Sequence, residues 1–401
     1  MKILFITPRI PYASVAGGMS IVHQRIRRLK ARGHELGVCS LHTPGEAIVS
    51  SDPLFTMLSD FETVPAPRPA PLALRAARLL LSSLPPYVHD YRSRVMMRRV
   101  GDRVHEGGYD AVVAEFMAMG QYLYRNPYLP AVRKIISSHF SVTRSFQTMA
   151  QTWGMSARGL RMRANIGRVM QYELNMYRSV DRVLVFTAHE RYQWLNADPT
   201  LRIHVIPCGV DTELFCPNPD QAPEEALVFT GQYDAPSNVD AVQWFLATAW
   251  PELKRRRPGL TFYVVGPGGP ENLGVAAARA DGVVVTGAVE DVRPYLHRAM
   301  VYVCPVRQGA GIRFKLFEAM AAGVPLVTTT FGAEGIPLQT GDNCFMADRP
   351  EIMVECIDLL LGDESLRQSL ARRARALAVE RFHWDRGVEL LEHVLLDTFA
   401  H

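Results

Sequence analysis

The chain has 401 residues, of which 48% are hydrophobic and 21% are charged, so it is not wholly disordered and can form two or more compact domains. Its formal net charge of +4 is too small for this length to indicate nucleic-acid binding. The six cysteines are scattered and form no C-x-x-C pair. Neither a zinc site nor a disulfide framework is therefore expected, and a reducing, cytoplasmic setting fits best.

The first half of the chain alternates short apolar runs with longer amphipathic stretches. The opening MKILFITPRIP lacks the long apolar core and cleavage site of a signal peptide, and it predicts a first strand instead. Further strands are expected at ELGVCS, AVVAE, KIIS and RVLVF, and helices at 19–32, 88–105 and 157–178. This alternation is typical of a parallel sheet covered by helices. No run reaches the length that spans a bilayer.

The pattern changes near residue 206. There IPCGVDTELFCPNPDQAPEE is rich in Pro, Gly and acids and has no helical or strand period, which indicates a linker. The alternation then resumes, with strands expected at ALVFTG, LTFYVVG, GVVVTG, VYVCP and PLVTT and helices near 238–248, 290–299 and 312–322. The tail from about 364 is helical in pattern. The sequence predicts two doubly wound α/β domains with a hinge, and a ligand site in a cleft between them.

The segment GAGIRFKLFEAMAAG combines a glycine-broken loop, cations and one carboxylate at the start of a helix. Glycine lets a ligand approach the backbone, and a helix beginning near Ile312 would present its positive end to an anion. The cations that could bind phosphate are Arg307, Arg313 and Lys315. An anion that also carries hydroxyl groups, such as a nucleotide sugar, would suit this junction.

Spacing distinguishes the cations. On a helix, residues two apart point roughly 200° from each other, so Arg313 and Lys315 cannot both face one ligand. We expect Lys315 to bind the diphosphate together with Arg307, and Arg313 to be a surface or interdomain charge. Glu318 lies one turn after Lys315. Its carboxylate either accepts hydrogen bonds from a diol or pairs with Lys315, and the residues alone leave both open.

Several stretches resemble glycosyltransferase family four, the retaining enzymes with two Rossmann-like domains. IPCGVDTELFCP is similar to the family's IPNGVDxxxFxP hinge, and GAGIRFKLFEAMAAGVPLVTT to its donor-site loop and helix. ITPRIPYASVAGG with RGHEL resembles its opening, and FTGQYDAPSNVDAVQWF the start of its second domain. These matches follow the family order over nearly the whole chain. The turn from Tyr233 to Asn238 and the segment GAVEDVRPYL resemble the sugar transferases of exopolysaccharide gene clusters.

The resemblance implies the GT-B fold, in which two Rossmann-like domains face each other across a cleft. Residues 1–207 would form an N-terminal acceptor-binding domain, and residues 208–380 a C-terminal domain that binds the nucleotide sugar. Residues 381–401 would form a terminal helix that packs back on the first domain. Their segment RFHWDRG resembles the family's FSW segment, which implies that Trp384 and the apolar face of the last helix are core.

The implied activity is that of a hexosyltransferase, which moves a sugar from a nucleoside diphosphate sugar to a glycan or lipid-linked acceptor with retention. No metal is implied, because the chain lacks a D-x-D motif and cations with a helix N-terminus can neutralise the diphosphate. Glu318 matches the glutamate that binds the ribose. The other donor-binding residues implied are Gly17, Gly18, Asn238, Gly287, Gln308, Gly309, Ala310 and Gly311.

One position departs from the family pattern. The E-x7-E motif would place a glutamate that contacts the donor sugar at residue 310, where this chain has Ala310. The sugar therefore stays open, and the contact passes to the backbone of 308–311 or to the Gln308 amide. Gly17 and Gly18 match the glycines under the donor phosphates, although a tight turn between strand and helix would also explain them.

The first domain supplies three more candidates. His139, in SSHFS after a strand, matches the family histidine near the reacting sugar, whereas residue type alone favours a structural histidine. Its implied role is positioning and charge stabilisation, because the leaving phosphate is thought to take the acceptor proton and no general base is needed. Arg9 either binds an anionic acceptor or pairs with an acid. Glu115 either binds an acceptor hydroxyl or interacts with a helix N-terminus.

Two segments, 75–104 and 157–170, are rich in arginine and poor in acids. Arginine interleaved with Leu, Met and Tyr suits a helix lying on anionic lipid, so peripheral association with the inner face of a membrane is expected. A solvated basic face over an ordinary core is the alternative. No nucleic-acid-binding motif accompanies this charge.

Three other functions fit the sequence less well. A degenerate protein that binds nucleotide sugar or glycan without transfer is favoured by Ala310. A nucleotide-sugar epimerase would need an acid and base pair facing one sugar, and no such pair stands out. A nicotinamide-dependent dehydrogenase fits poorly, because the first strand-to-helix turn lacks G-x-G-x-x-G.

Overall fold

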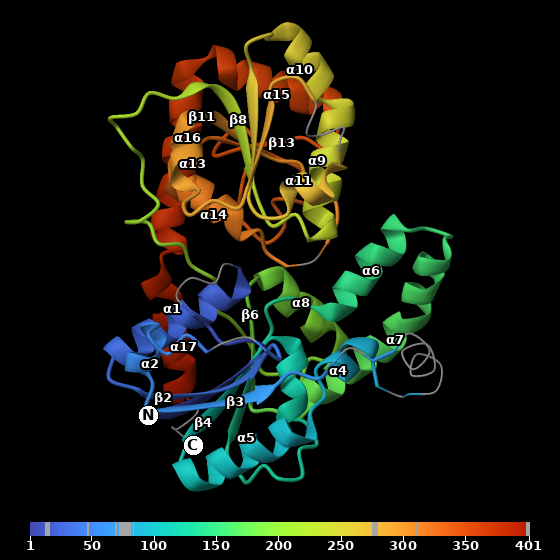
Figure 1. Cartoon of the computed structure of the whole chain (residues 1–401), viewed down its shortest axis with the longest axis vertical. Coiled ribbons are helices and arrows are strands. Elements are labelled where there is room, and N and C mark those ends of the chain that lie inside the picture. Colours follow the sequence, from blue (N-terminus) through green and yellow to red (C-terminus); the bar gives the residue numbers. More distant parts are fainter. Residues whose placement is uncertain are drawn as a thin grey trace. The chain divides into compact units, whose positions relative to one another are not determined.

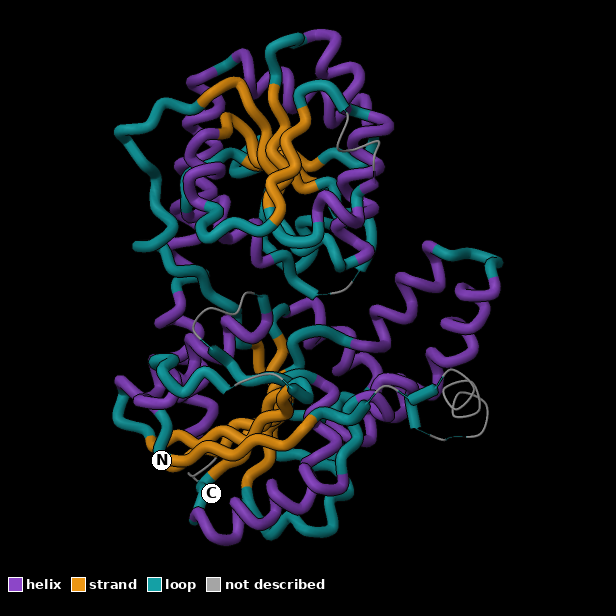
Figure 2. The backbone as a smooth tube through the Cα atoms, viewed as in Figure 1, coloured by secondary structure: helices purple, strands orange, loops and turns teal. Residues whose placement is uncertain are grey.

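The computed structural model describes residues 1–12, 17–45, 48–68, 70–71, 82, 84–274, 280–309 and 311–397. Contacts divide the chain into two compact units, one of Met1–Pro207 with Gly387–His401 and one of Cys208–Arg386. In each unit a parallel sheet is enclosed by helices, as the strands and helices of Figure 2 show. The predicted doubly wound architecture is confirmed.

The first unit is built on a seven-stranded parallel sheet in the order β3-β2-β1-β4-β5-β6-β7. Its strands are β1 (Lys2–Thr7), β2 (Glu35–His42), β3 (Asp60–Pro65), β4 (Ala111–Glu115), β5 (Arg133–Ser137), β6 (Arg182–Val185) and β7 (Ile203–Val205). The five strands expected in this half are present, and β3 and β7 are additional. Both lie at sheet edges, where a strand needs no continuous apolar run because it is only partly buried.

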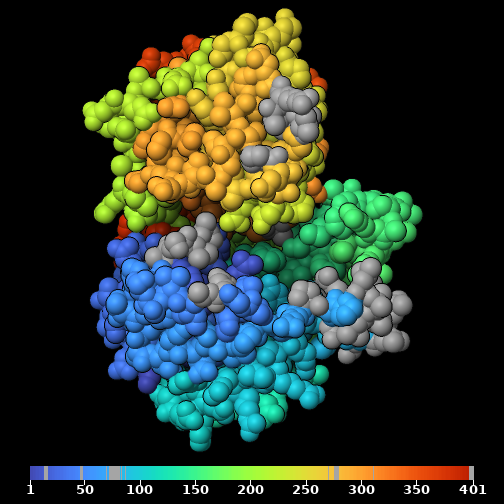
Figure 3. All heavy atoms as spheres, viewed as in Figure 1, coloured from blue at the N-terminus to red at the C-terminus, as the bar shows by residue number. Residues whose placement is uncertain are grey.

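Helices cover both faces of this sheet. On one face lie α1 (Gly18–Ala31), α2 (Leu54–Met57) and the end of α17 (Trp384–Asp397), and the other face carries α5 (Arg94–Gly107), η1 (Met117–Tyr122), α7 (Ala157–Arg178) and α8 (Ala188–Ala197). The helix α6 (Val142–Thr152) packs along α7. Figure 1 shows these two as a hairpin that extends away from the sheet, and in Figure 3 the same hairpin protrudes from the surface of this unit.

The helix expected at 88–105 is two helices in the structure. The first, α4 (Pro86–Asp90), ends before Ser93, whose hydroxyl accepts a hydrogen bond from the backbone N–H of Met96 and so caps α5. A serine that caps a helix in this way sits in extended backbone, which interrupts the helical run. The serine in YRSRVM indicates such a break, but the apolar periodicity on both sides of it predicts one continuous helix.

The second unit has a six-stranded parallel sheet in the order β10-β9-β8-β11-β12-β13. The strands are β8 (Glu224–Thr230), β9 (Thr261–Val265), β10 (Val283–Gly287), β11 (Ala299–Cys304), β12 (Leu326–Thr328) and β13 (Phe345–Met346). The helices are α9 (Pro236–Thr248), α10 (Trp250–Arg256), α11 (Gly269–Asn272), α13 (Arg293–Arg298), α14 (Phe314–Ala321), α15 (Pro350–Gly362) and α16 (Glu364–Arg381). Because β8 begins at Glu224, the linker ends slightly earlier than expected.

The end of the chain belongs partly to each unit. Phe382 packs against Phe317 with ring centroids 4.4 Å apart, and its carbonyl accepts a hydrogen bond from the N–H of Val210 in the linker, both within the second unit. From Gly387 onward α17 belongs to the first unit, where Val388 and Leu391 are buried. The boundary therefore falls inside α17 rather than at residue 381. No helix in the described ranges combines the length and apolar character needed to cross a membrane.

Candidate active site

Three neighbouring strands of the second sheet end in glycine. Gly231 follows β8, Gly266 follows β9 and Gly287 ends β10. Gly266 and Gly287 have φ values of 136° and 71°, which favour glycine, and a Cβ on Gly266 would overlap the carbonyl oxygen of Gly231. Backbone without side chains thus lies at the carboxyl ends of these strands, the edge where open α/β sheets bind ligands.

The helix α14 begins at this same edge, after β11. It starts at Phe314, two residues later than predicted, because Arg313 has the non-helical φ and ψ of −93° and 87°. Gly309 and Gly311 precede it with φ values of 113° and 83°. The loop therefore delivers the N-terminus of α14 through a backbone path that only glycine adopts readily.

Lys315, in the first turn of α14, is held by three elements. Its Nζ donates to Asn238 Oδ1 at 2.7 Å and lies 4.1 Å from the centre of the Phe229 ring. A Cβ on Gly231 would lie 2.8 Å from this nitrogen. Burial lowers the pKa of Lys315 to about 8. An ammonium has three donors, so the contact to Asn238 leaves N–H groups for an anion.

Asn238, on α9, contacts both Lys315 and the loop after β8. Its Oδ1 accepts from Lys315, and its Nδ2 donates to the carbonyl of Gln232 at 2.7 Å. Both ends of the amide are engaged within the protein. Asn238 therefore positions the Lys315 ammonium, and its predicted contact with the donor stays a prediction.

Glu318 lies one turn along α14. Its carboxylate makes no hydrogen bond or ion pair with the described residues, so the pairing with Lys315 that the sequence left open does not occur. Burial raises the pKa of Glu318 to about 7, against the lowering effect of the nearby Lys315 charge. A half-buried carboxylate without a protein partner is available to accept hydrogen bonds from a ligand.

The two arginines nearby are placed differently from expectation. Arg307 lies over α9, with Nη2 2.8 Å from Asp240 Oδ1 and its guanidinium carbon 4.9 Å from the centre of the Trp244 ring. Arg313 is not a surface charge: it donates to the carbonyl of Gly311 and packs over Phe331, and burial lowers its pKa. The reason is that Arg313 precedes α14 and is not part of its helical surface.

The remaining loop residues stay as predictions. Gln308 is partly buried, and its amide makes no hydrogen bond to a described residue. Gly309 and Gly311 lie on the approach to α14, while Ala310 falls outside the described residues. Gly287 accepts a hydrogen bond from the N–H of Gly266 at 3.1 Å, which joins two strand ends.

A buried polar cluster occupies the corresponding strand ends of the first unit. His139 follows β5 and donates from Nε2 to Glu115 Oε2 at 2.7 Å. Arg25, on α1, donates to Glu115 Oε1 at 2.9 Å and to Ser137 Oγ at 2.7 Å. The three charged or titratable side chains are at most 5% exposed. Glu115 and His139 meet because β4 and β5 are neighbours and their carboxyl ends lie at one edge.

Aromatic rings and glycines enclose His139. Its ring stacks on Phe116 at 3.8 Å, and Phe116 has the unusual φ of 69°. A Cβ on Gly18 would lie 2.6 Å from the Phe116 ring and 3.2 Å from Nδ1 of His139, so Gly18 must lack a side chain. Gly17, with a φ of 74°, is the residue just before α1. The buried Nδ1 has no hydrogen-bond partner among the described residues and lies beside the N-terminus of α1.

The charges of the cluster are set by this packing. Burial raises the pKa of Glu115, but Arg25 and His139 outweigh it and hold the pKa at about 2. Burial also lowers the pKa of His139, despite the Glu115 charge. A neutral His139 that donates to an ionised Glu115 carries its lone pair on Nδ1, where it can accept from a hydroxyl. Glu115 itself is completely buried, so it positions His139 and is not the acceptor contact predicted.

Two family models match the chain. The model described as Glycosyltransferase Family 4 matches residues 15–214, and the model described as Glycosyl transferases group 1 matches residues 224–363. The chain belongs to glycosyltransferase family 4. The family inferred from the sequence motifs is therefore confirmed.

The curated relatives are named as mannosyltransferases or glycosyltransferases. A phosphatidyl-myo-inositol mannosyltransferase of Mycolicibacterium smegmatis is 32% identical over 188 residues, which are 45% of this chain and 48% of that protein. The chain thus matches about half the length of that relative. A D-inositol 3-phosphate glycosyltransferase of Acidothermus cellulolyticus is 26% identical, over 98% of this chain and 88% of that protein.

The fold is shared with solved glycosyltransferase structures. HepE of Anabaena, in complex with UDP and glucose, matches 99% of this chain and 100% of its own with a TM-score of 0.69 and 15% identity. At this identity the likeness shows the fold alone. It is the GT-B fold, with two Rossmann-like domains.

Several residues of this family-4 site escaped sequence reasoning. Arg25 is one of several cations in α1, and its only signal is its position three residues after Val22 on the apolar face. Gly231 and Gly266 had a clearer signal, because three successive strand runs end in glycine. Arg9 was predicted as an acceptor contact. It is exposed and makes no ion pair with the described residues, so its role stays a prediction.

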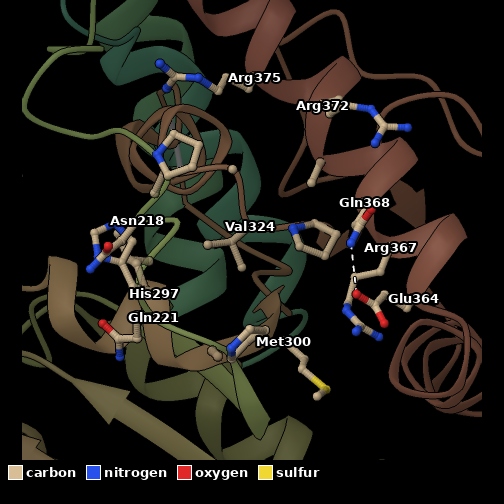
Figure 4. Close-up of a pocket in the computed structure, with 18 residues that line it drawn as sticks. Asn218, Gln221, His297, Met300, Val324, Glu364, Arg367, Gln368, Arg372 and Arg375 are labelled. Atoms are coloured by element: carbon tan, nitrogen blue, oxygen red, sulfur yellow. Dashed lines mark hydrogen bonds between the residues drawn. The ribbon is translucent and has the colours of Figure 1, made fainter.

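A pocket of about 410 Å³ lies at the opposite end of α14 from Lys315, beside Val324 (Figure 4). Several of its polar groups are engaged: Arg367 donates to the Leu360 carbonyl at 2.8 Å, and Arg375 donates to the carbonyls of Phe215 and Thr212 at 3.3 and 3.4 Å. Glu364 accepts from Gln368 at 2.9 Å. The Arg375 contacts hold the linker against α16, and we assign the pocket to packing.

Proposed function

We propose that the protein transfers a hexose from a nucleoside diphosphate sugar to a glycan or lipid-linked acceptor in polysaccharide or glycoconjugate biosynthesis. The observation that carries this proposal is the start of α14. There a fixed ammonium, Lys315, and an unpaired carboxylate, Glu318, lie on one helix face beside bare strand ends. Such a site offers charge to a diphosphate and acceptors to a diol.

Each group has a distinct task in this proposal. Lys315 and the N-terminus of α14 stabilise the charge that grows on the departing diphosphate. Glu318 accepts hydrogen bonds from the ribose hydroxyls. With Ala310 in place of the family glutamate, the Gln308 amide and the nearby backbone orient the sugar. Arg307 can bind the diphosphate only if its ion pair with Asp240 breaks. Lys315 therefore contributes most of the stabilisation of the diphosphate charge.

The first unit contributes His139. Its Nδ1 would accept a hydrogen bond from a hydroxyl of the transferred sugar, next to Gly17 and Gly18. We propose a retaining reaction in which the bond from the anomeric carbon to the diphosphate oxygen breaks and the acceptor oxygen bonds to that carbon on the same face. The acceptor proton passes to the diphosphate oxygen. In this proposal no metal ion is needed, because Lys315 and the N-terminus of α14 would supply the positive charge to the diphosphate.

The names of similar proteins mention a nucleotide and a phosphatidyl lipid. The HepE structure holds UDP and glucose, while the mycobacterial relative is named as a mannosyltransferase of a phosphatidyl lipid. A hexose donor and a lipid-linked or glycan acceptor are consistent with both. Arg9, exposed at the end of β1, is the candidate contact for an anionic acceptor.

We further propose that the protein acts in the cytoplasm, peripherally on the inner face of a membrane. At the tip of the α6–α7 hairpin Met155 is 74% exposed and Leu160 is 46% exposed, next to Arg158, Arg161 and Arg163. Exposed apolar side chains among arginines suit an anionic lipid surface. Much of the first arginine-rich segment, 75–81 and 83, lies outside the described residues.

A thermal-shift screen against UDP, GDP, ADP and their hexose conjugates tests the donor site, because a ligand that binds the native state raises its melting temperature. One nucleotide series should stabilise the protein, and Glu318→Ala should abolish the effect. Ala310 leaves a second possibility, a protein that binds the donor without transfer. Slow hydrolysis of the stabilising sugar nucleotide would identify an enzyme, and binding without any turnover would support this second function.

A further inference from the structure

The first unit has a cavity of about 580 Å³ on its α5, η1 and α7 side. Three arginines from three elements line it: Arg92 precedes α5, Arg125 follows η1 and Arg168 lies on α7. Arg92 and Arg168 belong to the two arginine-rich segments, whereas Arg125 belongs to neither. The cavity is therefore the place where separate basic parts of the sequence converge.

The described walls of this cavity carry positive side chains and no negative ones. None of the described residues that line it is an aspartate or a glutamate. The Arg92 side chain makes no ion pair or hydrogen bond with a described residue, and Arg168 donates to the carbonyl of Ser82 at 2.9 Å. Three guanidinium groups around one cavity repel one another, so an anion that enters it gains charge-assisted hydrogen bonds.

Arg125, one of the residues that line the cavity, has a strained backbone. Arg125 has a φ of 54°, one of two non-glycine residues with positive φ in the described ranges. A side chain in this region costs roughly 1 kcal/mol or more, which glycine would avoid. The guanidinium carbon lies 5.0 Å from the centre of the Tyr124 ring, so an aromatic face holds it in place. The chain thus keeps an arginine in a backbone conformation that glycine adopts more readily.

Tyrosines complete the wall. The rings of Tyr124 and Tyr172 meet edge to face at 5.7 Å. Burial raises the pKa of the Tyr172 phenol to about 12, and the charges of Arg92 and Arg125 oppose this rise. Arg92, Arg125 and Tyr172 all line the cavity, so both guanidinium groups lie in the surroundings of this phenol. The phenol can donate a hydrogen bond to an anion held between them.

We propose that this cavity binds the phosphate group of a phosphorylated polyol or sugar. The volume falls within the range of small-molecule sites, so the polyol fits beside the phosphate. Such a group could come from a lipid headgroup or from a soluble phosphate ester. The inference goes beyond the proposed transfer, because it requires neither a nucleotide nor a reaction.

Two binding measurements test it on the full chain. Glucose 6-phosphate and glucose are titrated by calorimetry, and vesicles of phosphatidylcholine are compared with phosphatidic acid or phosphatidylserine added to equal surface charge. The variants are Arg92→Ala and Arg125→Gly, which relieves the strained backbone and so should fold at least as well. The matched control is Arg98→Ala, which removes an exposed arginine of α5 that lies over Tyr128, outside the cavity.

We expect tighter binding of the phosphorylated probe, weakened on the order of tenfold in either cavity variant and unchanged in Arg98→Ala. Preference for phosphatidic acid vesicles would identify a lipid source, and binding of glucose 6-phosphate alone a soluble one. Equal binding by wild type and Arg125→Gly for both probes, or an equal loss in Arg98→Ala, would overturn the proposal.

The donor site is tested separately. Lys315→Ala should keep phosphate-probe binding, and Arg125→Gly should keep the thermal shift with nucleotides. Loss of the probe in Lys315→Ala would place the phosphate at the donor site and contradict the inference. If no nucleotide stabilises the protein, this result would count against the proposed function. It would not affect the proposal for this cavity.

Discussion

Lys315 and Glu318 show how burial tunes single residues. The same loss of solvent lowers the pKa of the ammonium to about 8 and raises that of the carboxyl to about 7. Their charged forms coexist mainly between these values. Asn238 adds direction, since its amide fixes where the ammonium lies.

We expect the affinity for a nucleoside diphosphate to be greatest between about pH 7 and about pH 8. Glu318 binds a diol best as the carboxylate, the form present above its pKa, and Lys315 binds phosphate as the ammonium, the form present below its pKa. Affinity should fall on both sides, as calorimetric titration across this range would measure. In Glu318→Gln the fall in affinity at acidic pH should disappear. If the fall remains in this variant, another group must cause it.

Lys315→Ala should lower turnover on the order of a hundredfold or more, because a preorganised stabiliser of the leaving group is lost. Asn238→Ala should lower it less, since the ammonium remains but is no longer aimed. Asn238→Asp keeps the acceptor oxygen and adds negative charge, so it should move the alkaline limb of the pH–rate profile upward. An unmoved limb would show that Asn238 does not act through Lys315.

At the scale of elements, parallel strands explain both clusters. Neighbouring strands end at one edge, so β4 and β5 bring Glu115 to His139, and β8, β9 and β10 bring three glycines together. Residues far apart in sequence thereby share one small volume. The helices then add Arg25 from α1 and Lys315 from α14.

Gly231→Ala should weaken nucleotide binding by pushing the Lys315 ammonium and the Asn238 amide from their places. The protein should still fold, because the contacts displaced are the ends of side chains. Gly167→Ala on α7 is the matched control, since a Cβ there meets nothing within 4 Å and alanine favours helix by about 1 kcal/mol. Thermal shift with the identified nucleotide measures both. Undiminished binding in Gly231→Ala would mean that Lys315 needs no such space.

Arg25→Ala should destabilise the protein by about 3–5 kcal/mol, because it leaves the Glu115 carboxylate buried without its cation. The pKa of Glu115 is lowered to about 2, so its stabilising effect is present above the usual carboxyl pKa and is lost as pH falls towards 2. In Arg25→Ala this loss should begin at higher pH. Urea denaturation at several pH values measures it.

The exposed Arg27, on the same helix, provides the comparison. Arg27→Ala should change the free energy of unfolding by less than about 0.5 kcal/mol. Similar effects of the two substitutions would argue against a special role for the buried pair.

At the scale of the whole molecule, α17 ties the chain end to its beginning. Val388, Leu391 and Leu395 are buried with residues of β1 and α1, and Glu392 pairs with Arg32 and His34. The residues just before them pack in the second unit. Stability of the first unit therefore depends on residues at the far end of the sequence.

Truncation before Phe382 should lower stability and activity together, because each lost core side chain contributes about 1.5–3 kcal/mol. A milder form of the test compares two leucines of α17. Replacing Leu391, which is 1% exposed, by Ala should lower the free energy of unfolding by about 2–5 kcal/mol. The same replacement at Leu396, which is 50% exposed, should hardly change it. Full activity in a stable truncated protein would contradict the role of this helix.

Much of this protein could be predicted from sequence. The five strands expected in each half are present, because buried parallel strands need continuous apolar runs that stand out locally. Edge strand β3 and the break at Ser93 were missed, since neither leaves a strong periodic signal. The motif GAGIRFKLFEAMAAG correctly indicated the junction that holds Lys315 and Glu318.

By itself the sequence determined two parallel α/β domains, the family and the loop that leads into α14. Tertiary structure alone decided which side chains are engaged: Asn238 with Lys315, Arg307 with Asp240, and Glu115 with Arg25 and His139. The reason is physical. Local runs depend on neighbours along the chain, whereas the partner and burial of a charged side chain depend on strands and helices that meet only after folding.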